Sequence, residues 1–389
     1  MILNMIEKAA CTGCGACRDA LPEEIEMRSD NEGFLYPYFV DGRDSSSATA
    51  EQVCHAFQGQ KVNNRRLKSF IAWEKDDRIR EASSSGGIFS ALAEKTISEG
   101  GIVAGASFDS SLHLRHTTAT SQQDYLPMRG SKYVQSDTRG IFRQVQESLN
   151  HGTKVLFTGV PCQISGLYHF LGKNYDNLFT CDVICYGVPS PGVFAAYVAY
   201  LEKKVKSKVV DYQFRSKALG WNKQSVSVKY ANGKRKKYRT TFCPFHTWFG
   251  LHLSLRPACF QCQFRVLDRE SDMTIGDFWG IESFRPDLDI SKGISIILAN
   301  SEKAMSYLEE LKDQLYLEEC PIEWPLKKNR YLVMNYPVPP QRTKFFSDYN
   351  SMPIEKLIKK YPPENLTGIV INKILRTLGI KTKPKPRAR

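Results

Sequence analysis

Short apolar runs alternate with amphipathic stretches from about residue 80 onward, and this pattern predicts a mixed α/β body. Residues 88–98 repeat apolar side chains at helical spacing, with Ser83–Ser85 placed to cap the helix. The following run GIVAGASF, at 101–108, has the composition of a buried strand. Residues 154–171 repeat the scheme with an apolar strand, a Gly-Val-Pro-Cys turn and an amphipathic helix.

Later segments add a hairpin and a C-terminal region without chemistry of its own. Residues 225–242 alternate around Asn232-Gly233 and predict a β-hairpin. Residues 301–315 have the spacing of an amphipathic helix, and 329–346 have the composition of an extended connection that packs over the body. At 389 residues the chain exceeds the usual size of one core, so we expect two or three structural units.

Eight of the eleven cysteines sort into two sets of four, and the first set opens the chain. Cys11, Cys14 and Cys17 stand in the run CTGCGAC, which is the start of an iron-sulfur motif. The usual fourth Cys of this motif precedes a Pro, and here Leu21 stands in its place before Pro22. In two-cluster ferredoxins this fourth Cys binds the other cluster, so its loss affects the distant site.

The second run of such a module can be read backward from Cys54. The ligand positions of one cluster then fall on Leu21, Asp44, Ser47 and Ala50, and those of the other on Cys11, Cys14, Cys17 and Cys54. We therefore interpret the segment as a two-cluster ferredoxin module reduced to one 4Fe-4S cluster. Two alternatives stay open: four thiolates also suit a zinc ion, and Cys54 could be an ordinary buried thiol.

The second set of cysteines lies on loops of the α/β body. Cys162 and Cys185 each follow a predicted strand, and open α/β sheets place ligands beyond the carboxyl ends of their strands. Cys259 and Cys262 form a CxxC pair further along. Together the four thiols predict a loop-built iron-sulfur site. Cys181 is an alternative to Cys185, although it begins a strand as a core residue would.

The formal net charge of +13 is concentrated in the segments 203–208, 233–239 and 381–389. Basic proteins often bind nucleic acid, but charge is the only support here for a zinc-stapled nucleic-acid-binding protein, so we expect no such partner. Solvated faces are the simpler interpretation. The functional alternative is docking of an acidic electron carrier of the ferredoxin or flavodoxin type.

No stretch reaches the about 18 apolar residues of a membrane span, and the N-terminus lacks the basic start and apolar run of a signal peptide. Eleven cysteines without a secretion signal favour metal or redox chemistry in a reducing compartment. We therefore expect a cytoplasmic protein with no transmembrane segment.

An ordered series of motifs resembles the coenzyme F420 hydrogenase/dehydrogenase beta-subunit family. The series spans about residues 8 to 300 and comprises the N-terminal cysteine run, SSSGGIFSAL, GSKYVQS, GVPCQISGL, ICYGVPSP, RPACFQCQF and SDMTIGDFWGI. The resemblance implies FAD beside a 4Fe-4S cluster in a catalytic domain, fed by clusters in a ferredoxin-like extension. With one cluster kept in the extension, the expected cofactors are two 4Fe-4S clusters and FAD.

Relatives oxidise or reduce coenzyme F420, while others, including a chlorophyll-metabolism reductase of plants, act on different molecules with the same cofactors. Bacterial members are often associated with surface-polysaccharide synthesis. The resemblance thus implies an FAD and iron-sulfur dependent oxidoreductase that moves electrons between a ferredoxin-type carrier and a two-electron substrate, small or glycan-linked. The alternative is a nonenzymatic electron-transfer subunit of a larger, hydrogenase-like complex.

The resemblance also places site residues. The implied flavin contacts are Ser85, Gly86, Gly87, Gly130, Ser131, Lys132, Tyr133, Gly159, Val160, Pro161 and Gln163, and the implied ligands of the catalytic-domain cluster are Cys162, Cys185, Cys259 and Cys262. Asp277, which could face the implied flavin pocket, and His246 are candidate proton donors or acceptors. For Asp277 the alternative is a turn aspartate that bonds local amides.

Four units are expected along the chain. They are a ferredoxin-like 4Fe-4S module over 1–62, an FAD and 4Fe-4S catalytic domain over 63–300, a helical and extended cover over 301–372, and a basic, disordered tail over 373–389.

Overall fold

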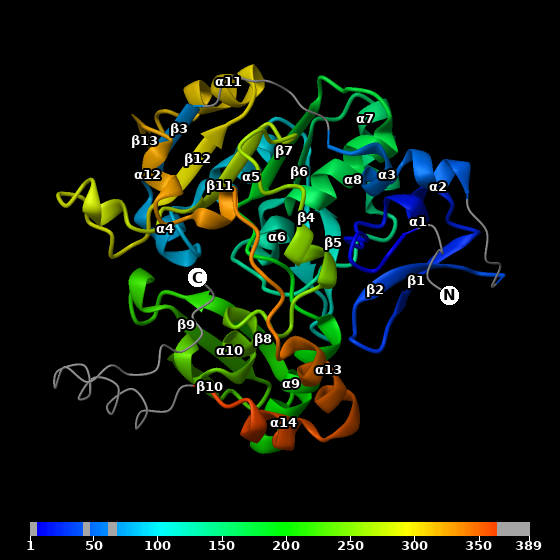
Figure 1. Ribbon diagram of the computed structural model, residues 1–389. Coiled ribbons are helices and arrows are strands. Elements are labelled where there is room, and N and C mark those ends of the chain that lie inside the picture. The colour runs from blue at the N-terminus through cyan, green and yellow to red at the C-terminus, as the bar shows by residue number, and fades with distance from the viewer. Residues whose placement is uncertain (1–5, 42–46, 61–67, 364–389) are drawn as a thin grey trace.

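A mixed eight-stranded sheet forms the upper lobe of the computed structural model, which describes residues 6–41, 47–60 and 68–363 (Figure 1). In spatial order its strands are β13 (Leu315–Cys320), β3 (Lys68–Glu74), β12 (Ser295–Ala299), β11 (Met273–Asp277), β7 (Leu178–Val183), β6 (Val155–Gly159), β4 (Ile102–Phe108) and β5 (Leu114–Ala119). The run from β11 to β4 is parallel, and antiparallel strands flank it on both sides. The expected mixed α/β class is confirmed.

Both faces of this sheet are buried, which explains the continuous apolar runs of its central strands. Successive residues of one strand belong to different cores: Leu156 packs with Leu92 on one face, and Phe157 packs with Ile164 on the other. The helices of this lobe are α4 (Asp77–Ala82), α5 (Ile88–Ser98), α6 (Gln122–Tyr125), α7 (Ile141–Asn150), α8 (Pro161–Leu171) and α11 (Glu302–Glu310).

A three-stranded antiparallel sheet forms the lower lobe (Figure 1). Its order is β10 (Arg235–Arg239), β9 (Ser225–Tyr230) and β8 (Val209–Ser216), and its helices are α9 (Pro191–Val205), α10 (Pro244–Gly250), α13 (Arg342–Ser351) and α14 (Ile354–Lys360). The predicted hairpin over 225–242 is confirmed as β9 and β10, with Gly233 at φ 81° in the turn. Phe194, Phe214 and Phe245 pack together in the core between these elements.

The N-terminal module lies at the side of both lobes, beside α7 and α8 (Figure 1). It consists of the hairpin β1 (Ile25–Ser29) and β2 (Leu35–Phe39) with α1 (Ala16–Ala20), α2 (Ala48–Gln52) and α3 (His55–Gln58). The buried Asp19 carboxylate accepts the N–H groups of Gly140 and Phe142, at 2.7 and 3.0 Å, where α7 begins. Phe34 and Tyr36 enter the core of the lower lobe, so the module is fixed to both lobes.

Short helices complete the described chain. They are α12 (Glu323–Leu326), η1 (Leu126–Met128), η2 (Trp221–Lys223), η3 (Thr240–Phe242), η4 (Pro257–Gln261), η5 (Ile281–Ser283) and η6 (Arg330–Leu332).

The structure differs from the expected elements at two places. Helix α5 begins at Ile88 after Gly87, so Ser83–Ser85 do not cap it, and the Ser85 hydroxyl instead donates to the carbonyl of Ile294 at 2.9 Å. Residues 315–320 form β13, so part of the expected cover over 301–372 completes the main sheet. Asp44 and the expected tail over 373–389 lie outside the described residues.

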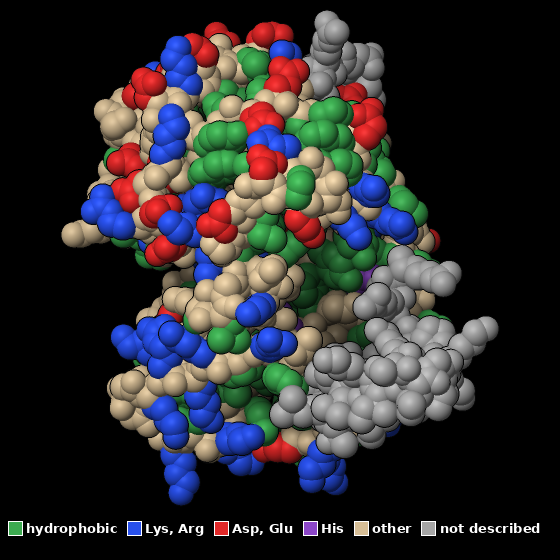
Figure 2. Space-filling model, turned by 90° about the vertical axis from the view of Figure 1, so that its left-hand side faces the viewer, with side chains coloured by type: hydrophobic (Ala, Val, Ile, Leu, Met, Phe, Trp, Pro, Cys, Tyr) green, Lys and Arg blue, Asp and Glu red, His purple; other side chains and the backbone are tan. Residues whose placement is uncertain are grey.

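The described helices include none that is long and apolar enough to cross a membrane. Figure 2 shows the surface hollowed between the lobes, with lysine and arginine gathered on the lower lobe and both charges mixed on the upper lobe. The basic runs at 203–208 and 233–239 belong to the lower lobe. The first run spans the end of α9 and the residues after it, and the second forms the β9–β10 turn and β10.

Candidate functional site

The four N-terminal cysteines surround one small cavity, and we call them the first tetrad. Its members are Cys11, Cys14, Cys17 and Cys54. Gly13 folds the loop at φ 70°, and a side chain there would collide with Gln135. Burial, together with the neighbouring Cys54, raises the pKa of Cys14 to about 12. Buried thiolates held this close require a compensating cation, which an iron-sulfur cluster supplies.

The second set of cysteines also converges, from three separate segments of the chain, and forms the second tetrad. Its members are Cys162, Cys185, Cys259 and Cys262. The N–H of Gly187 donates to the sulfur of Cys185 at 3.3 Å, and the N–H of Val188 donates to that of Cys259 at 3.4 Å. Burial and then the other three cysteines raise the pKa of Cys162 well above its ordinary value. Cys181 lies apart within β7, where it contacts the carbonyl of Asp182.

Helix α8 lies between the tetrads. Cys162 is its second residue, and Gly166 lies one turn later against Cys14. A Cβ at Gly166 would lie 2.9 Å from the sulfur of Cys14, so only glycine permits this approach.

Two side chains link the segments that carry the two tetrads. Arg256, three residues before Cys259, donates to the carbonyl of Cys11 at 2.8 Å and to its sulfur at 3.6 Å. Gln263, next to Cys262, donates to Nδ1 of His55 at 2.9 Å, and His55 follows Cys54 in the chain. The two sites are therefore immediate neighbours.

Within residues 6–41, 47–60 and 68–363, no group of three or more His, Cys, Asp or Glu side chains is arranged to hold a single metal ion. A four-iron cluster spaces its thiolates more widely than one zinc ion does, because each thiolate binds a different iron. The all-cysteine donor sets, with backbone N–H groups that donate to two sulfurs of the second tetrad, fit iron-sulfur clusters.

A cavity of about 1140 Å³ separates the two lobes, and Cys162 and Cys185 lie on its wall. The carboxyl ends of β6, β7 and β11 open onto it, as expected for a ligand site in an α/β sheet. Among the described residues, its charged side chains are the four cations Arg129, Lys132, Arg215 and Lys328 and the single carboxylate Asp277. The cavity therefore suits an anionic ligand of dinucleotide size.

Nine of the eleven expected flavin contacts line this cavity. They are Ser85, Gly87, Gly130, Ser131, Lys132, Tyr133, Gly159, Val160 and Gln163. Gly86 and Pro161 do not, and the N–H of Gly86 is already bonded to the Ser295 hydroxyl at 2.9 Å. The amino ends of α5 and α8 open onto the cavity, and unpaired N–H groups at such ends favour phosphate.

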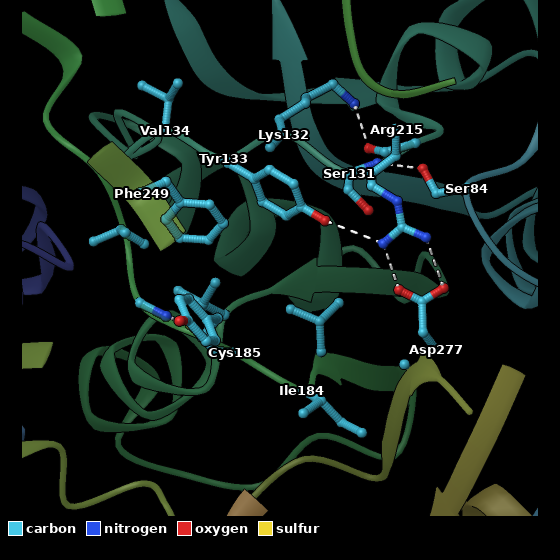
Figure 3. Close-up of a pocket in the computed structure, with 18 of the residues that line it drawn as sticks. Ser84, Ser131, Lys132, Tyr133, Val134, Ile184, Cys185, Arg215, Phe249 and Asp277 are labelled. Carbon is cyan, nitrogen blue, oxygen red and sulfur yellow. Dashed lines mark hydrogen bonds and ion pairs between the residues drawn. The ribbon is translucent and has the colours of Figure 1, made fainter. Parts of the chain in front are cut away.

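The loop from Gly130 to Tyr133 is held in place by its own polar groups (Figure 3). The N–H of Ser131 donates to the Ser84 hydroxyl at 2.8 Å. The Lys132 ammonium donates to the carbonyls of Met128, Arg129 and Gly130, and burial lowers its pKa to about 7. Lys132 thus stabilises the loop through these carbonyls. It also lies on the cavity wall, where it can contact a bound anion.

Asp277 lies at the end of β11 and forms an ion pair with Arg215 of β8 at 2.8 Å (Figure 3). Trp221 donates its indole N–H to the same carboxylate at 2.9 Å, and Arg215 donates to the Tyr133 hydroxyl at 3.3 Å. Burial acts to lower the pKa of Arg215, but Asp277 more than offsets it. The pair joins the two lobes, and Tyr133 keeps its own hydroxyl proton available to a ligand.

His246 lies on the cavity wall in α10, yet both ring nitrogens contact the protein. Nε2 lies 3.1 Å from the carbonyl of Phe214 and Nδ1 lies 3.4 Å from the sulfur of Cys243. Burial lowers the pKa of His246 to about 3, so its ring is neutral near pH 7. These contacts favour a structural role, and proton transfer by His246 stays a prediction.

Sequence reasoning missed Arg215, Arg256 and Gly166. Arg256 lies in RPACFQC, close enough to the CxxC pair to be a local signal. The partners of Arg215 and Gly166 lie far away in the chain, so no local pattern marks these two residues.

Two family profiles match this chain, and both describe the coenzyme F420 hydrogenase/dehydrogenase beta subunit. The profile of its N-terminal part matches residues 69–142, and the profile of its C-terminal part matches residues 152–324. A solved chain from the F420-reducing NiFe hydrogenase complex of Methanosarcina barkeri is similar over 76% of this chain and 95% of that chain, with 18% identity and a TM-score of 0.47. No curated protein matches the sequence significantly.

The two matched ranges together span more than half of the 389 residues and contain the second tetrad and most of the cavity wall. They also confirm the resemblance seen in the ordered motifs. The chain belongs to the coenzyme F420 hydrogenase/dehydrogenase beta-subunit family, whose members are electron-transfer oxidoreductase subunits.

Proposed function

We propose that the chain is an iron-sulfur flavoprotein that moves electrons between a ferredoxin-type carrier and a two-electron substrate, through two 4Fe-4S clusters and FAD. One observation carries the proposal: the first tetrad, α8, the second tetrad and the cavity follow one another in space. Cys14 lies against Gly166 of α8, Cys162 begins that helix, and Cys162 and Cys185 line the cavity.

FAD, when bound, supplies the exchange between one-electron and two-electron transfer. The residues present fit it. The amino ends of α5 and α8, with Arg129 nearby, suit the pyrophosphate. Tyr133 stacks on Phe249 with ring centroids 4.8 Å apart, and this pair forms an apolar wall that excludes water (Figure 3). The Tyr133 hydroxyl accepts an N–H of Arg215 and can donate its own proton to a ligand, while the Asp277 carboxylate pairs with the same arginine.

The proposed electron partner is an acidic ferredoxin or flavodoxin, because the net charge of +13 favours encounter with an acidic surface. The proposed substrate is a small or glycan-linked molecule of surface-polysaccharide biosynthesis, following the bacterial proteins whose motifs this chain resembles.

Anaerobic purification of the full chain tests the proposal. The expected protein is brown and contains roughly eight irons and eight sulfides per chain, with FAD bound. Cys54→Ser should alter only the spectrum of the first tetrad. Cys320→Ser is the matched control, because Cys320 is buried beside Ser69 and belongs to neither tetrad.

Three outcomes would contradict parts of the proposal. Zinc in place of iron would contradict the assignment of both clusters. About four irons per chain would contradict the assignment of one of them. Both clusters without flavin would indicate a nonenzymatic electron-transfer subunit instead.

A further inference from the structure

Arg256 is a fully buried cation with an unusual set of partners. Its guanidinium donates to the carbonyls of Cys11 and Leu35 at 2.8 and 3.0 Å, to the side-chain oxygen of Gln135 at 3.2 Å, and to the sulfur of Cys11 at 3.6 Å. It also lies 3.9 Å from the ring centroid of Tyr36.

No carboxylate within the described residues forms an ion pair with Arg256. Burying an unpaired charge is costly, so the site needs negative charge close to the guanidinium. The thiolate of Cys11, which the guanidinium contacts, is the nearest source of that charge.

Arg256 also belongs to the loop of the second tetrad. Its own N–H donates to the carbonyl of Val188 at 3.0 Å, and its carbonyl accepts the N–H of Cys259 at 3.0 Å. The backbone of this residue therefore shapes one tetrad while its side chain contacts the other.

We propose that Arg256 sets the reduction potential of the first tetrad's cluster and holds that cluster in register with the second. The inference rests on the proposed function, because it requires both clusters. Reduction adds negative charge to a cluster, so a buried guanidinium that donates to a ligand sulfur favours the reduced state. Arg256 thus makes the first site a better electron acceptor for the carrier.

The second tetrad lacks such a contact among the described residues. The charges of Arg256 and Arg265 both act on Cys259, but neither guanidinium donates to a sulfur of this tetrad, and Arg265 donates to the carbonyls of Tyr186 and Met334. We therefore expect the charge on Arg256 to raise the reduction potential of the first tetrad's cluster more than that of the second tetrad's cluster.

Arg342 is a matched control. It is also buried, donates to the carbonyl of Leu255, the residue before Arg256, and forms an ion pair with Glu32 of the N-terminal module. Arg342 therefore ties the same module to the body but contacts no cysteine.

The experiment is a redox titration of the full-length protein, monitored by electron paramagnetic resonance, for the parent, Arg256→Gln, Arg256→Lys and Arg342→Gln. We expect Arg256→Gln to shift the first cluster's potential to a more negative value, with a smaller shift for Arg256→Lys, which keeps the charge. The second cluster's potential should move less, and Arg342→Gln should leave the first unchanged.

An unchanged first potential in Arg256→Gln, or an equal shift in Arg342→Gln, would overturn the inference and leave the proposed function standing. Loss of the first cluster from both Arg256 variants would also overturn it, because the residue would then serve assembly and not potential. A parent protein without two clusters would instead refute the proposed function itself, and the inference with it.

Discussion

At the scale of single residues, the ion pair between Asp277 and Arg215 is the main charged contact across the cavity. Asp277→Asn removes the negative partner and leaves the Arg215 charge buried without compensation. We expect the free energy of unfolding to fall by about 3 kcal/mol, as for other buried pairs that lose one member. Urea unfolding at pH 7 measures this change.

Asp287→Asn is the control for Asp277→Asn, because Asp287 forms its ion pair with Arg285 at the surface, where water screens the charges. Equal loss of stability in the two variants would show that the buried ion pair of Asp277 contributes no more to the free energy of unfolding than the surface pair of Asp287.

His116 is a second residue with a testable consequence. Its ring lies between the Ser136 hydroxyl and the carbonyl of Thr158, and burial lowers its pKa to about 4 from 6.5. The unfolded chain therefore binds a proton at a higher pH than the folded one. Stability contributed by neutral His116 is present above pH 6.5 and is lost as the pH falls toward 4, at about 1.4 kcal/mol per pKa unit.

Urea unfolding between pH 7.5 and pH 5.5 tests this sign. His116→Asn should reduce the acid loss by the share of one histidine, because burial also lowers the pKa of His55, His246 and His252. His113→Asn, at an exposed position three residues earlier, should keep the parent's slope. A His116→Asn variant with the parent's full pH dependence would exclude His116 as the source.

At the scale of elements, α8 separates the tetrads through Gly166. Alanine in a helix is normally more stable than glycine by roughly 0.5–1 kcal/mol. Gly166→Ala should have the opposite effect, because its Cβ would lie 2.9 Å from the sulfur of Cys14. We expect loss or distortion of the first cluster, measured as iron content and paramagnetic signal.

Gly250→Ala in α10 is the control for Gly166→Ala, because a Cβ there meets no atom within 4 Å. Normal iron content and signals in Gly166→Ala would contradict this prediction, because they would show that the loop of Cys14 can move away from the added Cβ and still bind the cluster.

Elements with local signals were predictable from the sequence. The hairpin over 225–242 follows from its alternation and its Asn-Gly turn, and 154–171 follows from a strand, a turn and a helical repeat. Helix 88–98 was predicted correctly as α5, but its cap was predicted wrongly, because Ser85 bonds Ile294, a partner 209 positions away. β13 was missed because its alternation is meaningful only beside β3.

The candidate site divides in the same way. Cysteine spacing and strand ends led to the eight thiols, which the structure gathers into two groups. Gly166 and Arg215 could not be predicted, since their importance comes from contacts with Cys14 and Asp277, which folding brings together from distant parts of the chain.

At the scale of the whole molecule, the N-terminal module is packed against both lobes and lies beside α8 (Figure 1). The first tetrad therefore lies next to the second tetrad, whose Cys162 lines the cavity between the lobes. Under the proposed function, electrons that enter through the module would pass Cys14, Gly166 and Cys162 on their way to the cavity.

A serial course predicts a specific pattern of loss. Cys17→Ser and Cys162→Ser each interrupt it, so each should lose nearly all flavin reduction by reduced ferredoxin, and the double variant should be no slower than either alone. Dithionite, which is small enough to reach the cavity directly, should still reduce the flavin in all three, and Cys320→Ser should keep both activities. Stopped-flow absorbance of the flavin measures each rate. If Cys17→Ser kept the parent's rate with ferredoxin, electrons would enter at the second tetrad, and the first would lie outside the course.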